Sequence, residues 1–104
     1  MTTLWSPTSA NVAQSNMTRF VNFVEQNHSV RFHTYADLYD WSIHNDQAFW
    51  DYFWDFAHIQ AHSKGETLFK KGTTFETSRF FPQAYLNYAQ NLLRQTGDTD
   101  AIIF

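Results

Sequence analysis

Two histidines, His58 and His62, are the residues whose types and spacing most suggest chemistry. They lie four positions apart, so a helix through both would place them on one side. Zinc peptidases that use such a pair need a glutamate directly after the first histidine as the general base, and this chain has Ile59 there. Since no third ligand lies nearby, we interpret the pair as polar residues that close a helix end, and we predict no metal site.

Other patterns that could support catalysis are weak or missing. The stretch KKGTT at 70–74 resembles a phosphate-binding loop only superficially, because one glycine after two lysines is too little, and we interpret it as a solvated turn. The chain has no GxxxxGK[ST], GxGxxG or GxSxG motif. It also has no cysteine, which excludes disulfides and thiolate chemistry. We therefore predict no catalytic and no cofactor-binding residue among these 104 residues.

Length and charge restrict the possible partners. The 104 residues fit one small domain, 1–104, and the net charge of −3 argues against nucleic-acid binding. Residues 32–63 hold five acids and no Lys or Arg. We interpret this stretch as a solvated acidic face, with a docking surface for a basic partner as the alternative. The N-terminus is unlike a signal peptide and no apolar run approaches a membrane span, so we expect a cytoplasmic protein without a membrane partner.

Capping residues and apolar periodicity predict a mainly α fold, a small domain of about four helices. We expect helices near 15–27, 35–44, 47–58 and 82–94, with a further short helix capped by Thr8 or Ser9. Ser15 would cap the first of the four, Thr34 and Asp37 would form a capping box for the second, and Asp46 would cap the third. Pro82 suits the first position of the last helix, and Gly97 would follow its end.

Aromatic residues dominate the predicted helix 47–58. Its apolar side chains recur at i, i+3, i+4 and i+7 and are Phe49, Trp50, Phe53, Trp54, Phe56 and Ala57. We interpret this stripe as core or domain interface, in preference to base stacking or a hydrophobic ligand pocket. In the helix before it, one face would be shared by Tyr35, Leu38, Tyr39 and Ser42.

The rest of the chain lacks helical periodicity. Residues 62–80 predict an irregular loop with one or two short strands, around 68–69 and 74–75. The last residues, 100–104, form a short apolar run that is typical of a buried strand.

Several short motifs, in order and at similar intervals, resemble those of the acetoacetyl-CoA synthetases. They are LWSP at 4–7, SNMTRF at 15–20, YADL at 35–38, WSI at 41–43, FW at 49–50, WDF at 54–56 and FFPQAYLNYAQNLL at 80–93. The last resembles the family's FPGAxLNxAENLL segment, with Gln83 where Gly is frequent and Gln90 where Glu is frequent. Acetyl-CoA synthetases share a looser form of the pattern.

The resemblance implies the N-terminal domain of such a ligase, ahead of its AMP-binding catalytic domain. The complete enzyme would be a cytoplasmic acyl-CoA synthetase of lipid metabolism that joins acetoacetate to coenzyme A with ATP and magnesium. The family's catalytic motifs have no counterpart in these residues, so none of its catalytic residues is carried over. The alternative is a stand-alone helical module that binds a protein partner through an aromatic face.

The resemblance also implies a partner, the adenylation domain of the same parent chain. We expect an inter-domain interface that includes Phe80, Phe81, Leu86, Tyr88, Ile102 and Phe104. Without its partner, this surface could support self-association, because an unpaired apolar strand edge is a template for pairing. The alternative is that these side chains close the small domain's own core.

Overall fold

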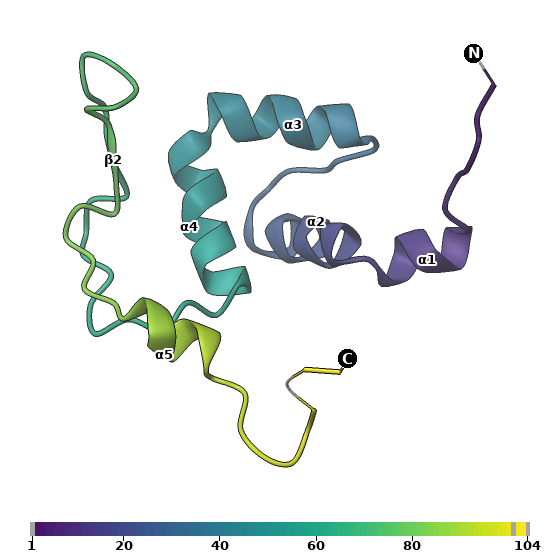
Figure 1. The fold of residues 1–104 in the computed structure, drawn as a ribbon. Coiled ribbons are helices and arrows are strands. Elements are labelled where there is room, and N and C mark those ends of the chain that lie inside the picture. The colour runs from purple at the N-terminus through teal and green to yellow at the C-terminus, as the bar shows by residue number, and fades with distance from the viewer. Residues whose placement is uncertain (1, 101, 104) are drawn as a thin grey trace. The chain divides into compact units, whose positions relative to one another are not determined.

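The computed structural model describes residues 2–100, 102 and 103, and the chain divides into two compact units, Met1–Ala57 and His58–Phe104 (Figure 1). The predicted mainly α class is confirmed, since helices dominate and the sheet is small. The elements are α1 (Ser9–Gln14), α2 (Asn16–Asn27), α3 (Tyr35–His44), α4 (Asp46–Phe56), β1 (Phe69–Lys70), β2 (Arg79–Phe80) and α5 (Tyr88–Leu92).

The first three helices begin at the predicted caps. The side chain of Thr8 accepts a hydrogen bond from the backbone N–H of Asn11, and that of Ser15 accepts one from the N–H of Thr18. Thr34 and Asp37 form the predicted capping box at the start of α3. These local hydrogen bonds satisfy amides that a helix start leaves without partners, which is why these boundaries agree with the prediction.

Helix α4 starts and ends differently from the prediction. Its N-cap is Asn45, whose side chain does not cap the helix but donates to the carbonyl of Trp41. Asp46 is the first helical residue, and its carboxylate accepts the N–H of Gln47. The helix ends at Phe56, two residues before the predicted end. The backbone of His58 is left-handed, with φ of 51°, which a continuing helix cannot accommodate.

The core of the first unit is small and aromatic. Among the described residues, the buried side chains are Phe20, Val24 and Leu38, from α2 and α3. Rings of α4 cover Phe20 with edge-to-face geometry, with centroid distances of 5.6 Å to Phe49 and 5.2 Å to Phe56. Helices α2, α3 and α4 therefore pack around a few interlocking rings.

Two carboxylates fix the connector between α2 and α3. Glu25 accepts the N–H of Phe32 at 2.8 Å, and Asp37 accepts the N–H groups of His33 and Thr34, also at 2.8 Å. Three successive amides of an irregular segment are thereby paired without secondary structure.

The second unit contains one short antiparallel sheet. Phe69 pairs with Phe80, and Lys70 pairs with Arg79. The expected strand around 68–69 is confirmed to within one residue. The expected strand at 74–75 is wrong, because these residues lie in the turn between β1 and β2, where side-chain hydrogen bonds satisfy the backbone.

The last helix is much shorter than predicted, since α5 covers only Tyr88–Leu92 instead of 82–94. Tertiary hydrogen bonds use the backbone that the helix would need. The N–H of Tyr85 donates to the carbonyl of Ser63, and the carbonyl of Tyr85 accepts the N–H of His62. The side chain of Asn87 then caps α5 by accepting the N–H of Gln90.

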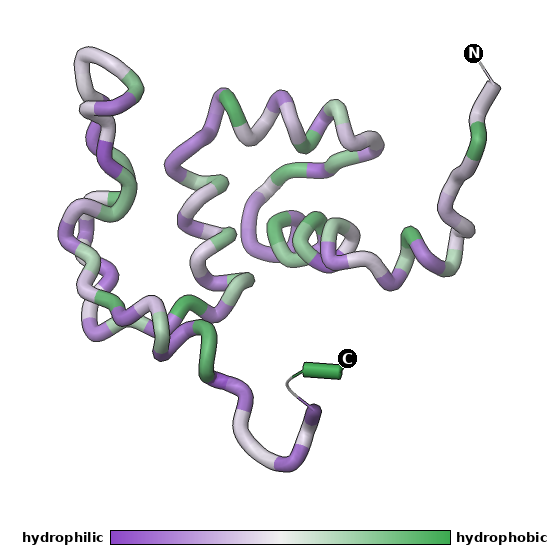
Figure 2. Tube along the Cα trace, viewed as in Figure 1, coloured by the Kyte–Doolittle hydropathy of each residue, from purple (hydrophilic) through white to green (hydrophobic). Residues whose placement is uncertain are grey.

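The end of the chain also departs from the prediction. Helix α5 ends with Leu93 as its C-cap, so Gly97, with φ of 107°, does not cap it. Ile102 and Ile103 are 79% and 85% exposed and are not in a strand, so the prediction of a buried strand is wrong for them. Figure 2 colours this pair as strongly hydrophobic. Ala101 and Phe104 lie outside the described residues.

Within the described part of the chain, none of the helices is long and apolar enough to cross a lipid bilayer.

Candidate interaction surfaces

The predicted interface residues lie in the second unit, and most of them are exposed. Phe80 is 44%, Leu86 48%, Tyr88 75% and Ile102 79% exposed. Phe81 is half-buried, and Phe104 lies outside the described residues. Their role as an inter-domain interface stays a prediction, with closure of the small domain's own core as the alternative.

Side-chain hydrogen bonds to the backbone hold much of the second unit together, beside one pair of packed rings, Phe69 and Phe80, whose centroids are 4.7 Å apart. The described residues include no buried side chain in this unit. The amide of Asn91 binds both backbone groups of Gln60, at 2.8 Å each, and the side-chain oxygen of Gln83 accepts the N–H groups of Glu66 and Thr67 at 3.0 Å. Backbone polar groups are thus satisfied, while several large apolar side chains of this unit, such as Leu86 and Leu92, are exposed to solvent.

Phe81 has a strained backbone at one edge of this surface. Its φ of 46° lies in the left-handed region, which costs a bulky residue roughly 1–2 kcal/mol. Hydrogen bonds hold it there: its N–H donates to the carbonyl of Leu68, and its carbonyl accepts the N–H of Ala84. Such strain persists where surrounding contacts enforce it, and it is frequent at functional sites.

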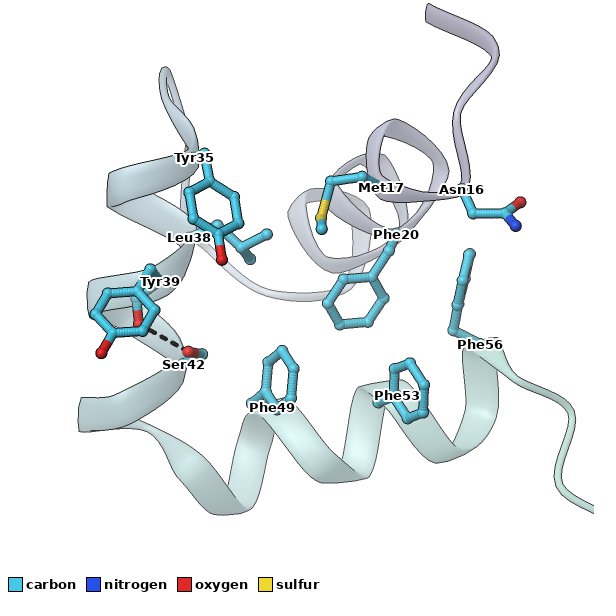
Figure 3. Close-up of a pocket in the computed structure, with 10 residues that line it drawn as sticks. All are labelled: Asn16, Met17, Phe20, Tyr35, Leu38, Tyr39, Ser42, Phe49, Phe53 and Phe56. Carbon is cyan, nitrogen blue, oxygen red and sulfur yellow. Dashed lines mark hydrogen bonds between the residues drawn. The ribbon is translucent and has the colours of Figure 1, made fainter. Parts of the chain in front are cut away.

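The first unit carries an open apolar pocket of about 280 Å³ between α2, α3 and α4 (Figure 3). The predicted face of α3 is confirmed, since all four of its residues line this pocket. The complete lining is Asn16, Met17, Phe20, Tyr35, Leu38, Tyr39, Ser42, Phe49, Phe53 and Phe56. Tyr35 is 68% and Tyr39 53% exposed, so these two rings border an opening toward solvent.

The aromatic stripe of α4 has two roles that its periodicity does not separate. Phe49 and Phe56 pack against the core ring of Phe20, as a core stripe should. Phe53 also contacts Phe20, at 5.9 Å between ring centroids, but it is 40% exposed, and all three rings line the pocket. Met17 on α2 also lines it, and the sequence alone gave no signal for Met17, because the pocket depends on how three helices meet.

Hydrogen bonding lowers the pKa of the two carboxyl groups beside the α2–α3 connector, those of Glu25 and Asp37. The N–H of Phe32 is the main cause that lowers the pKa of Glu25, with the Arg31 guanidinium, 3.0 Å away, adding to it. The N–H groups of Thr34 and His33 lower the pKa of Asp37. Both groups serve as structural acceptors.

The two histidines at 58 and 62 do not share a helix, because α4 ends before them. Among the described residues, no group of three or more His, Cys, Asp or Glu side chains could hold a metal ion. The KKGTT stretch lies at β1 and in the turn after it.

Comparison with known proteins gives one consistent result. The chain is 38% identical over 101 residues to the acetoacetyl-coenzyme A synthetase of Rhizobium meliloti (strain 1021), covering 97% of this chain and 15% of that protein. It is 36% identical over 93 residues to the acetoacetyl-CoA synthetase of Xenopus tropicalis (88% of this chain, 13% of that protein), and 31% identical over 100 residues to that of Gallus gallus (95% and 14%).

The chain thus spans only about one seventh of the length of these relatives. No family model matches it, and no solved structure matches it significantly. The resemblance predicted from the sequence motifs is nevertheless confirmed: over nearly its whole length, this chain is similar to a part of several acetoacetyl-CoA synthetases.

Proposed function

We propose that this chain is the N-terminal structural domain, or cap, of an acetoacetyl-CoA synthetase. The complete enzyme would convert acetoacetate, ATP and CoA to acetoacetyl-CoA, AMP and diphosphate, and this segment would contribute no catalytic residue. The observation that carries the proposal is the match over 97% of this chain to only 15% of a protein that bears this name. ATP, magnesium and CoA would then bind to the part of the complete enzyme outside these residues. The cytoplasmic location and the role in lipid metabolism stay predictions.

The second unit supports a role as a docking segment. Several of its apolar side chains are exposed while side-chain amides pair its backbone groups, so these apolar side chains are available to a partner surface. In this proposal the partner is the adenylation domain, which would cover Leu86, Tyr88, Phe80, Phe81 and Ile102. Self-association through the same residues would be the behaviour of the unpartnered segment.

A chimeric enzyme tests the proposed cap function. This chain replaces the matching residues of the Rhizobium meliloti synthetase, and acetoacetate-dependent ATP–diphosphate exchange is measured. We expect activity from the chimera and only background from the 104-residue chain alone. Leu86→Asp combined with Tyr88→Asp should lower the chimera's activity and melting temperature, because charges would enter the proposed interface. Leu4→Asp, at a side chain 98% exposed in the other unit, is the control.

Two results would reject the proposal. One is exchange above background from the isolated chain. The other is a folded chimera that is inactive or insensitive to the double substitution. The second candidate, a stand-alone interaction module with an aromatic binding face, is favoured by the open pocket of about 280 Å³ in the first unit. It would gain support if the chimera failed while the isolated chain bound a protein partner through this pocket.

A further inference from the structure

Among the residues that the structure describes, one hydroxyl in the turn between β1 and β2 has no hydrogen-bond partner. This turn carries hydroxyls at positions 73, 74, 77 and 78. The hydroxyls of Thr77 and Ser78 donate to the carbonyl of Thr74, at 3.0 and 3.1 Å, and the hydroxyl of Thr74 lies 3.3 Å from that of Thr77. The hydroxyl of Thr73 remains, and this residue is exposed. A modifying enzyme can therefore reach Thr73 without breaking a hydrogen bond of its side chain.

Basic residues flank Thr73, since Lys71 and Lys70 precede it by two and three positions. Lys70 also lies opposite Arg79 in the sheet, and like charges in directly opposed positions destabilise a strand pair. The guanidinium of Arg79 donates to the carbonyl of Glu76 at 2.7 Å, which keeps this cation at the turn. From β1 to β2 the chain holds three basic residues and one acid, which gives a net charge of +2. A negative group added at position 73 would offset this charge.

The segment that carries Thr73 can open locally. None of the side chains described in the second unit is buried, so residues 70–74 can leave the turn without exposing a core. The hydrogen bonds that would be lost belong to the turn itself, such as that from the N–H of Thr74 to the hydroxyl of Thr77, at 3.1 Å. Water replaces such exposed hydrogen bonds when the turn opens. An enzyme groove that binds an extended segment can therefore take up the two lysines and Thr73 together.

We propose that Thr73 is the phosphorylation site of a Ser/Thr protein kinase whose substrate groove is acidic. Lys70 and Lys71 would bind in this groove, because opposite charges select the substrates of such enzymes. The Oγ1 atom of Thr73 attacks the γ-phosphorus of ATP, the bond from this phosphorus to the bridging oxygen breaks, and ADP leaves. The hydroxyl proton passes to the catalytic aspartate of the kinase. This site goes beyond the proposed cap function, since none of its residues belongs to the proposed interface.

Phosphorylation would act on the turn through charge. A phosphate adds about −1.5 to −2 charges at pH 7, which brings the net charge from β1 to β2 to roughly zero. Lys70 and Arg79 would then pair with phosphate oxygens, which offsets their mutual repulsion. The modified turn would be better ordered than the unmodified one. The exposed ring of Phe75 would then lie on a neutral surface instead of a cationic one, so different partners would bind there.

Phosphate transfer to the purified 104-residue chain tests the site. The probes are ATP and the catalytic subunit of cyclic AMP-dependent protein kinase, which selects basic substrates, and tandem mass spectrometry locates the phosphate. We expect transfer to Thr73, loss of this product in Thr73→Val, and transfer slowed by about tenfold in Lys70→Gln with Lys71→Gln. Arg19→Gln, an exposed cation of the other unit, is the control and should leave the rate unchanged. Thr34 also follows a basic residue by three positions, but its hydroxyl accepts a hydrogen bond in the capping box, so it should stay unmodified.

Amide hydrogen exchange tests the effect of the phosphate on the turn. Exchange at the N–H groups of Gly72 and Thr74, which donate to hydroxyls of the turn, should slow by about threefold on phosphorylation. Arg79→Gln or added salt should reduce this slowing, because both weaken the pairing of phosphate with cations.

Several results would overturn the proposal. The assigned site fails if no phosphate is transferred, if other hydroxyls are preferred to Thr73, or if the rate does not depend on the two lysines. The charge effect fails if the phosphorylated turn exchanges its amides as fast as the unmodified turn. Neither measurement uses the chimeric enzyme, so this proposal and the cap function can fail separately.

Discussion

At the residue scale, the ionisable side chains of this chain serve structure more clearly than chemistry. Glu25 and Asp37 accept backbone N–H groups of the α2–α3 connector, and these hydrogen bonds lower the pKa of both carboxyl groups. The side-chain amides of Asn91 and Gln83 also pair backbone groups, in the second unit, where the described residues include no buried side chain. A sequence motif predicted only the Thr34–Asp37 pair, because the other partners are far apart in sequence or lack a known pattern.

Replacing Asp37 tests this structural role through its pH dependence. A folded-state pKa below the usual 3.8 means that the carboxylate stabilises the fold fully above that pH, and that the contribution is lost as pH falls through the lowered value. Asp37→Asn should therefore lower the melting temperature at pH 7, and the difference from the unsubstituted chain should shrink below about pH 4. Glu25 is present in both chains, so its own titration cancels.

Thermal melts followed by circular dichroism at pH 7, 4.5 and 2.5 give this comparison. Asp40→Asn on the same helix, outside the capping box, is the matched control and should differ little from the unsubstituted chain. An equal difference for Asp37→Asn at pH 2.5 and pH 7 would show that its carboxylate charge does not stabilise α3.

At the element scale, the sequence predicted those helices whose boundaries depend on local hydrogen bonds. Helices α2 and α3 begin at their serine and threonine caps, within about one residue of the prediction. The prediction failed for 82–94, where Tyr85 pairs with the distant segment at 62–63 and Asn87 starts a shorter helix. Long-range pairing cannot be deduced from periodicity, so the apolar spacing after Pro82 was misleading.

Some features of the candidate surfaces could likewise be predicted from the sequence, and others depend on tertiary packing. Exposure of Phe80, Leu86, Tyr88 and Ile102 was predicted, because the chain offers more apolar residues than a small domain can bury. The shared face of α3 was also predicted, from helical spacing. The pocket was not predicted, because it forms where three helices meet. Its lining residue Met17 lies on α2, and tertiary packing sets the position of α2 against α3 and α4.

Two identical substitutions at opposite extremes of burial test the packing of α2. Phe20 is 5% exposed and contacts three rings of α4, so Phe20→Ala should cost about 3–5 kcal/mol. This is a large part of the stability of a small domain, and the variant should be largely unfolded at 37 °C. Phe75→Ala removes the same atoms from a side chain 86% exposed and should change stability by less than about 0.5 kcal/mol.

Chemical denaturation followed by circular dichroism measures both, at a concentration low enough for the chain to be monomeric. Equal destabilisation by the two substitutions would mean that Phe20 does not organise the core.

At the scale of the whole molecule, the buried side chains are distributed unevenly. All three buried residues of the described chain belong to the unit Met1–Ala57, whereas His58–Phe104 is held by side-chain hydrogen bonds and a two-stranded sheet. Each hydrogen bond contributes a net stabilisation of only about 0.5–1.5 kcal/mol to the folded state. The conformational entropy lost when one residue is ordered costs a comparable amount. We therefore expect the second unit to gain stability when a partner surface covers its exposed apolar side chains, as the proposed cap function implies.

Separating the two units tests this dependence. A peptide of residues 1–57 keeps every buried residue of the described chain, so we expect helical circular dichroism and a cooperative, if low, melting transition. A peptide of residues 58–104 should give a largely disordered spectrum with rapid amide exchange at Gln60 and Tyr85, because its side-chain hydrogen bonds close loops without an apolar core to offset the entropy. Slow exchange at those amides in the isolated second peptide would contradict the argument.

Adding the remainder of a synthetase extends the test. Protection that appears only after this addition would show that folding of the second unit is coupled to docking. The melting temperature should then rise as the partner concentration exceeds the dissociation constant.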